Sequence, residues 1–84
     1  MESFEQLLRK YIDEIGSNIY QFAKVSKVNR VNIQRYISGQ RIPSPETLEQ
    51  MIQKLHLSQV DLEQLLESYK IKSIGKKLYY QRKY

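Results

Sequence analysis

The sequence predicts an all-α domain of five helices. Apolar residues recur at three- and four-residue spacing in successive segments of the 84-residue chain, and no segment shows the alternation of a strand. Serine, asparagine or proline stands at the start of these segments, and glycine follows two of them, as expected at helix ends. A chain of this length has room for one domain that buries about two-thirds of its unfolded surface. Its apolar residues must therefore serve one small core, and a buried substrate cavity is not expected.

The first two helices are indicated by caps and apolar spacing. Ser3 and Gln6 form a capping box, and an apolar face continues from Phe4 to Ile15 until Gly16 ends it. A second, short helix over residues 19–26 follows two residues that can cap it, Ser17 and Asn18.

Three more helices follow with clear start signals. Asn29 can cap a third helix that Ser38 and Gly39 close, with glycine where a left-handed residue is favoured. Ser44 and Pro45 begin the fourth, because proline at the first helical position loses no hydrogen bond. The fifth begins at Ser58 with Asp61 in a capping-box pattern and is expected to end near Tyr69; its predicted apolar face consists of Val60, Leu62, Leu65 and Leu66.

Residues 70–84 differ from this body, so two units are predicted: a domain over 1–69 and a basic extension over 70–84. The extension mixes six cations with three tyrosines around one glycine, and it is a short helix, an ordered arm or a disordered tail. Apolar residues at helical spacing favour a helix or arm that packs on the domain: Ile71, Ile74, Leu78 and Tyr79. Its cations would then face phosphates or a second subunit, whereas the alternative is a solubilising end: Lys70, Lys72, Lys76, Lys77, Arg82 and Lys83.

The charge of +5 is distributed in blocks of alternating sign. Residues 16–43 hold five cations and no acid, residues 70–84 hold six cations and no acid, and the segments before each are net acidic. Clustered cations without nearby carboxylates favour contact with a polyanion.

Composition excludes several classes of function. Without cysteine there is neither a disulfide nor a thiolate metal site, and the lone His56 cannot build a zinc site, so we expect no metal and no cofactor. No nucleophile and base stand in a recognisable catalytic arrangement, so the chain is not expected to be an enzyme. Its apolar runs are too short for a membrane span and its N-terminus is not a secretory signal, which predicts a cytoplasmic protein.

The stretch KVNRVNIQRYISG, residues 27–39, combines cations and amides without an acid. If Val28, Ile33, Tyr36 and Ile37 point into the core, then helical geometry places Arg30, Val31, Gln34 and Arg35 on the outer face. Arginine can donate twice to guanine, asparagine and glutamine can pair with adenine, and valine suits a thymine methyl group. This face therefore has the chemistry that reads bases in the DNA major groove.

Residues 18–57 resemble the helix-turn-helix of phage repressors and Xre-type bacterial regulators. The resemblance is carried by Phe22-Ala23, Val28, Ile33, Tyr36 and the run GQRIPSPETL from Gly39 to Leu48. It implies a five-helix lambda-repressor-like domain up to about residue 69, encoded by a bacterium or a phage. Two departures concern contacts: Ile19 stands where the family commonly has glutamine, and Lys27 stands where it favours glycine at the turn.

The resemblance also implies roles for individual residues. A recognition helix at about 29–38 would read bases through Arg30, Val31, Asn32, Gln34 and Arg35. Phosphates would be held by Asn18, Asn29, Ser38, Gln40 and Arg41, with Asn29 also acting as a helix cap.

Two functions remain open at this stage. The first is a sequence-specific, repressor-like transcriptional regulator that binds double-stranded DNA as a homodimer, with a further effector or protein partner if the chain belongs to a longer regulator. The second is a protein-interaction module on the same fold, which would use Val31, Ile37 and the tyrosines of the extension and bind DNA weakly or not at all.

Overall fold

The computed structural model describes residues 2–82, with side chains as far as Ile74. Within these residues the chain forms five α-helices and no strand. They are α1 (Phe4–Glu14), α2 (Ile19–Ser26), α3 (Arg30–Ile37), α4 (Pro45–Leu55) and α5 (Gln59–Arg82). The predicted all-α class is confirmed, and α1 to α4 match the expected elements.

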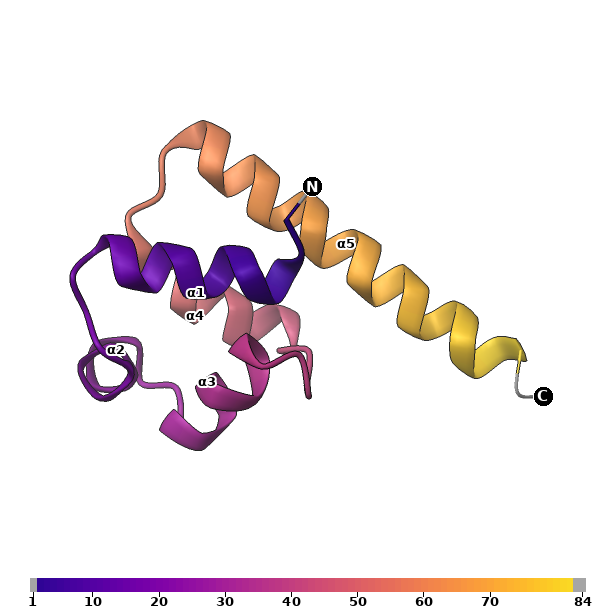
Figure 1. Cartoon of the computed structure of the whole chain (residues 1–84), viewed down its shortest axis with the longest axis horizontal. Coiled ribbons are helices and arrows are strands. Elements are labelled where there is room, and N and C mark those ends of the chain that lie inside the picture. The colour runs from indigo at the N-terminus through magenta and orange to yellow at the C-terminus, as the bar shows by residue number, and fades with distance from the viewer. Residues whose placement is uncertain (1, 83–84) are drawn as a thin grey trace.

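Helices α1 to α4 gather around one core, and α5 runs along their edge before its C-terminal half projects beyond them (Figure 1). Helix α1 contributes most to this core because one of its faces is apolar over its whole length. The buried side chains are Phe4, Leu7, Leu8, Tyr11 and Ile12 of α1, together with Phe22, Val28, Ile33, Tyr36, Leu48, Met51, Leu55 and Leu65.

The predicted helix starts are confirmed by cap hydrogen bonds. The Ser3 backbone N–H donates to Gln6 Oε1 at 2.9 Å, and the Gln6 backbone N–H donates to Ser3 Oγ at 3.3 Å, which completes the capping box. Ser44 Oγ accepts from the Thr47 backbone N–H at 3.2 Å, directly before Pro45. Each cap satisfies an N–H group that has no partner within its own helix.

The turn between α2 and α3 keeps a left-handed residue although glycine is missing from it. Lys27 ends α2 with φ 60° and ψ 25°, a conformation that costs a non-glycine residue about 1–2 kcal/mol. The buried Ser26 braces this turn, because its Oγ donates to the Phe22 carbonyl at 2.6 Å and accepts from the Val28 N–H at 3.4 Å. The departure at Lys27 therefore leaves the helix-turn-helix geometry intact.

Helix α5 corrects three sequence predictions. It does not end near Tyr69 but continues to Arg82, because residues 70–82 contain no proline, and their one glycine, Gly75, weakens a helix without ending it. Two members of its predicted apolar face, Val60 and Leu66, are exposed, whereas Leu65 is fully buried. The expected packing of Ile71 and Ile74 on the domain is also wrong, since both are exposed.

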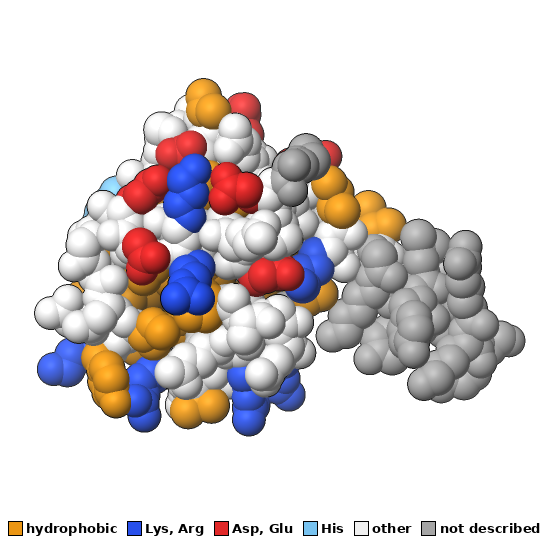
Figure 2. Space-filling model, viewed as in Figure 1, with side chains coloured by type: hydrophobic (Ala, Val, Ile, Leu, Met, Phe, Trp, Pro, Cys, Tyr) orange, Lys and Arg blue, Asp and Glu red, His pale blue; other side chains and the backbone are white. Residues whose placement is uncertain are grey.

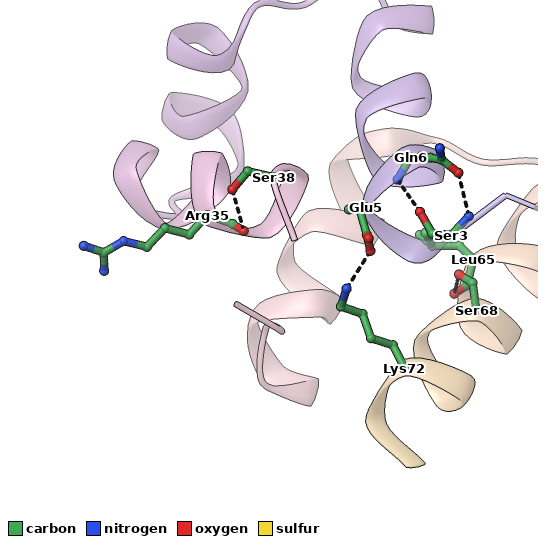
Figure 3. Close-up of polar contacts among 8 residues, drawn as sticks. All are labelled: Ser3, Glu5, Gln6, Arg35, Ser38, Leu65, Ser68 and Lys72. Atoms are coloured by element: carbon green, nitrogen blue, oxygen red, sulfur yellow. Dashed lines mark hydrogen bonds and ion pairs between the residues drawn. The ribbon is translucent and has the colours of Figure 1, made fainter. Parts of the chain in front are cut away.

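Three contacts hold the middle of α5 against the domain. The Tyr69 hydroxyl donates to the Pro43 carbonyl at 2.7 Å, and the Tyr69 ring lies 5.5 Å from the ring of Phe4. Lys72 Nζ pairs with Glu5 Oε2 at 2.7 Å (Figure 3). Tyr69 therefore attaches α5 to the loop after α3 and to α1, and Lys72 attaches the start of the basic extension to α1.

The remaining predictions about the extension are not tested. Leu78, Tyr79 and the cations Lys76, Lys77, Arg82 and Lys83 lie outside the residues whose side chains the structure describes. The division into a domain and an extension at residues 69 and 70 stays a prediction, although the helical backbone of α5 is continuous across it.

Candidate nucleic-acid interface

Helix α3 presents its predicted outer face. Ile33 and Tyr36 are buried and Ile37 packs partly against the core, so the opposite side of this eight-residue helix faces away from the domain. Val31, Gln34 and Arg35 are exposed there, and Arg30 and Asn32 are half-buried beside them. The five predicted base-reading residues are therefore brought together on or next to one accessible face.

Two guanidinium groups lie at opposite ends of this face in different surroundings. Arg30, the first residue of α3, lies over the ring of Tyr20 with its Cζ atom 4.2 Å from the ring centroid. Arg35, in the last turn, extends away from the domain into solvent (Figure 3). Arg30 is thus held against α2, whereas Arg35 is free to reach outward.

Asn29 and Asn18 serve first as helix caps. Asn29 Oδ1 accepts from the backbone N–H groups of Val31 at 2.8 Å and Asn32 at 3.3 Å. Asn18 Oδ1 accepts from the Gln21 backbone N–H at 2.8 Å. Capping uses the carbonyl oxygen of each amide, so the amide NH₂ remains available as a donor to an anion. Both side chains lie at helix N-termini, where partial positive charge favours phosphate.

The loop after α3 is closed on the Arg35 carbonyl. This oxygen accepts from Ser38 Oγ at 3.2 Å and from the backbone N–H groups of Gln40 at 2.9 Å and Arg41 at 3.2 Å. Gly39 makes the turn possible with φ +81°, a conformation that glycine adopts without strain. The side chains of Ser38, Gln40 and Arg41 are exposed around it, and their role in holding phosphate stays a prediction.

The cations of this region are not neutralised by the protein. Residues 16–43 contain five cations and no acid, and the two salt bridges between described side chains, Lys10–Glu2 and Lys72–Glu5, lie elsewhere. Figure 2 shows carboxylates together with some Lys and Arg over α1 and the start of α5, whereas the lower edge, where α2 and α3 lie in Figure 1, shows Lys and Arg without carboxylates. The α2–α3 side therefore has the field that attracts a polyanion.

Three residues of α2 and the turn were missed as site candidates from sequence. Tyr20 contacts Arg30, and Lys24 and Lys27 are exposed cations one and two turns further along from Tyr20. Lys24 and Lys27 both lie in the acid-free segment 16–43, so the positive charge of that segment could have identified them as candidates. The contact between Tyr20 and Arg30 could not be predicted from sequence, because it depends on how α2 and α3 pack against each other.

The predicted phosphate-holding residues bracket the outer face of α3. Tyr20, in the first turn of α2 that Asn18 caps, contacts Arg30 at the start of α3. Ser38, Gln40 and Arg41 lie at the opposite end, after the last residue of α3. The structure therefore arranges a row of donors along one helix, with further polar groups at both ends.

Two packed helices joined by a left-handed turn, with the second helix exposing donors, define a DNA-binding domain of the helix-turn-helix class. A family model for helix-turn-helix domains matches residues 8–62, and the chain belongs to this family, the Xre/Cro/C1 type. No curated protein and no solved structure gives a significant match. Membership of the family implies DNA binding, and families of this type are typically regulators rather than enzymes.

The described residues lack two other kinds of feature, a metal site and a membrane span. There, no three His, Cys, Asp or Glu side chains are grouped so that they could hold a metal ion. In the same part of the chain, no helix is both long and apolar enough to cross a membrane.

Proposed function

We propose that the chain is a sequence-specific transcriptional regulator of the repressor type that reads the major groove with α3. The observation that carries this proposal is the outer face of α3, where donors of two kinds stand together without a carboxylate. An α-helix with its side chains is about 10–12 Å in diameter, which suits a major groove about 12 Å wide.

Each side chain on this face suits a particular base. Arg30 and Arg35 can each donate two hydrogen bonds to guanine O6 and N7, and Asn32 and Gln34 can pair with adenine N6 and N7. Val31, exposed between them, suits a thymine methyl group. Each such contact discriminates among base pairs, so the set specifies a short sequence.

Phosphate contacts would fix the orientation of α3 in the groove. Asn18 and Asn29 offer amide donors at two helix N-termini, and Ser38, Gln40 and Arg41 offer donors after α3. Because these groups lie at both ends of the recognition helix, they would contact the backbone on either side of the bases that α3 reads.

Two copies would bind together, since one small module buries limited surface on DNA. The exposed side of α5 offers a contact surface, since Val60, Ile71 and Ile74 are 63%, 53% and 56% exposed. Two copies that bind half-sites one helical turn apart would hold their recognition helices about 34 Å apart.

The direct test is selection of bound sites from a random DNA pool, followed by shift assays on the selected and random duplexes at two salt concentrations. The proposal expects an enriched motif with two half-sites, a two-to-one protein-to-duplex mass, and affinity that falls steeply with salt. Equal affinity for all duplexes would contradict sequence reading. Absence of DNA binding would favour the protein-interaction module, although Ile37, one of its expected contacts, packs partly against the core.

A further inference from the structure

We propose that Tyr20 is a positioning residue for Arg30, holding its guanidinium so that the N–H edge faces the bases before DNA arrives. The inference rests on the proposed base reading by α3 and deepens it, because it adds a determinant of specificity on α2. It is carried by the stacking of Arg30 over the Tyr20 ring, with Cζ 4.2 Å from the centroid.

The guanidinium group of Arg30 can serve two partners at once. As a cation over an aromatic ring, it is attracted by the negative face of the Tyr20 ring. Base reading uses the edge, where the N–H donors lie. Because the guanidinium has five N–H donors and a guanine uses two of them, contact with the Tyr20 ring leaves enough donors for a base.

Tyr20 is fixed by the helix that carries it. Helix α2 is capped at its start by Asn18 and anchored by the fully buried Phe22, two residues after Tyr20. The backbone of Arg30 is equally fixed, because Asn29 caps α3 immediately before it. Each partner thus projects from a rigid helix, and the contact restricts a long side chain that would otherwise sample many rotamers.

The position of Arg30 at the start of α3 is electrostatically unfavourable for a cation, and the Tyr20 ring offsets part of this cost. A cation at a helix N-terminus is disfavoured by the partial positive charge of the backbone N–H groups there. Within the described part of the chain neither salt bridge involves Arg30, so the negative face of the Tyr20 ring is the attractive group identified beside it. A base edge or phosphate would add the remaining compensation in the complex.

Tyr20 contributes little to the core. It is 64% exposed, so its replacement should leave folding unchanged. This separates its effect on DNA recognition from any effect on stability and makes the role directly testable.

The experiment compares Tyr20→Leu, Tyr20→Phe, Arg30→Ala and the Tyr20→Leu/Arg30→Ala double variant on selected and random duplexes. Leucine removes the aromatic face, whereas phenylalanine keeps it and removes only the hydroxyl. We expect Tyr20→Leu to lose about two- to fivefold in affinity for the selected site with an unchanged salt slope, and Tyr20→Phe to bind like the native chain. The double variant should bind like Arg30→Ala alone, because the ring acts only through the arginine.

A structural readout accompanies the binding data. Proton NMR of the free protein should show ring-current shifts of the Arg30 side chain that persist in Tyr20→Phe and disappear in Tyr20→Leu. Val25→Ala, which changes another exposed apolar side chain of α2, serves as the matched control and should alter neither measurement.

Three results would overturn the inference while leaving base reading in place. These are full affinity in Tyr20→Leu, an equal loss in Tyr20→Phe, and a Tyr20→Leu loss that persists when Arg30 is alanine. The last two would show that Tyr20 itself contacts DNA. If Arg30→Ala binds the selected site as tightly as the native chain does, the role of Arg30 in the proposed function fails instead, and the inference fails with it.

Discussion

At the scale of single residues, the outer face of α3 contains two arginines that sequence spacing alone treats as equivalent. Arg30 lies over Tyr20, whereas Arg35 extends into solvent and its own carbonyl closes the following loop. We expect Arg30 to lose less conformational entropy than Arg35 when DNA binds, because Tyr20 already restricts its side chain. Arg35 has no such restriction and can adopt more rotamers. The two are therefore expected to share a chemical role but to differ in how they are presented to DNA.

Arg30→Ala or Arg35→Ala should each weaken binding to the selected site by about 1–3 kcal/mol and affect random DNA much less, because a lost bidentate contact removes discrimination. The measurement is the ratio of affinities for the two duplexes at one salt concentration. Equal losses on both would show that the two arginines contact phosphates rather than bases.

Lys27→Gly should stabilise the domain by up to about 1 kcal/mol, because Lys27 has the left-handed conformation that glycine adopts without strain. The gain is limited by the larger backbone entropy of glycine in the unfolded chain. Urea denaturation measures the change. Lys27→Ala is the control, since it removes the same charge without relieving the strain, and a similar gain in both would assign the effect to charge.

The candidate site was predictable as far as local chemistry determines it. Val31, Gln34 and Arg35 were placed outside from helical spacing, and Asn29 was recognised as a cap from its residue type. Tyr20 was not recognised, because its contact with Arg30 depends on how α2 and α3 lie against each other. Spacing within one helix contains no information about that packing.

At the scale of elements, Asn29 at the start of α3 caps the helix and is also proposed to hold a phosphate. Asn29 Oδ1 accepts two backbone N–H bonds, and its amide nitrogen remains free to face an anion. A carboxylate in the same position would keep the cap but oppose phosphate. The two roles of Asn29 can therefore be separated by substitution.

Asn29→Asp should keep the stability of the native chain, because aspartate is an equally good cap and favours the helix dipole. The same change should lower DNA affinity at low salt, since it adds a negative charge at the interface. Asn29→Ala should instead cost about 1 kcal/mol of stability. Thermal melts and shift assays on the three proteins make the comparison, and unchanged DNA affinity in Asn29→Asp would place Asn29 away from phosphate.

Helix α5 is longer than the sequence predicted, because it ends at Arg82 rather than near Tyr69. The regular apolar pattern weakens after Tyr69, and the helix was therefore expected to stop there. A helix needs no apolar face to continue where no proline stops it, and the contacts of Tyr69 and Lys72 hold α5 at the edge of the domain. Such long-range contacts link residues far apart in sequence, so periodicity could not predict them.

The ion pair between α1 and α5 should make stability depend on pH. Lys72 donates to Glu5 and holds the pKa of that carboxyl below its usual value. A lowered folded pKa contributes stability that is present above the unfolded value of about 4.3 and is lost as pH falls through the folded value. Lys72→Gln should therefore be less stable than the native chain by about 0.2–1 kcal/mol near pH 7, with the difference fading at pH 3.

Denaturation at several pH values tests this expectation. Lys70→Gln is the matched control, because Lys70 is an exposed neighbour on the same helix and its loss changes the net charge equally. A pH-dependent difference of the same size in both variants would assign the effect to net charge rather than to the pair with Glu5.

At the scale of the whole molecule, charge is segregated over a body whose longest dimension is 43 Å. The α2–α3 side contains cations without acids, and the groove between α1 and α5 is lined by four carboxylates: Glu2, Glu5, Glu63 and Glu67. The acidic side would be repelled by DNA, which orients the basic side toward it. The second basic block, beyond Tyr69, then remains to be assigned to DNA or to a partner subunit.

Two truncations decide the role of that block. Ending the chain after Ile74 removes four cations and keeps the contacts of Tyr69 and Lys72, whereas ending it after Tyr69 removes all six. If the cations contact phosphates, the shorter chain should keep its helical spectrum while the slope of log affinity against log salt falls by about two units or more. The intermediate chain shows how much of the fall belongs to Lys70 and Lys72. If both truncated chains keep the salt slope and the mass of the DNA complex, the basic block only aids solubility. If only the shorter chain loses cooperative unfolding, residues 70–74 are part of the folded domain.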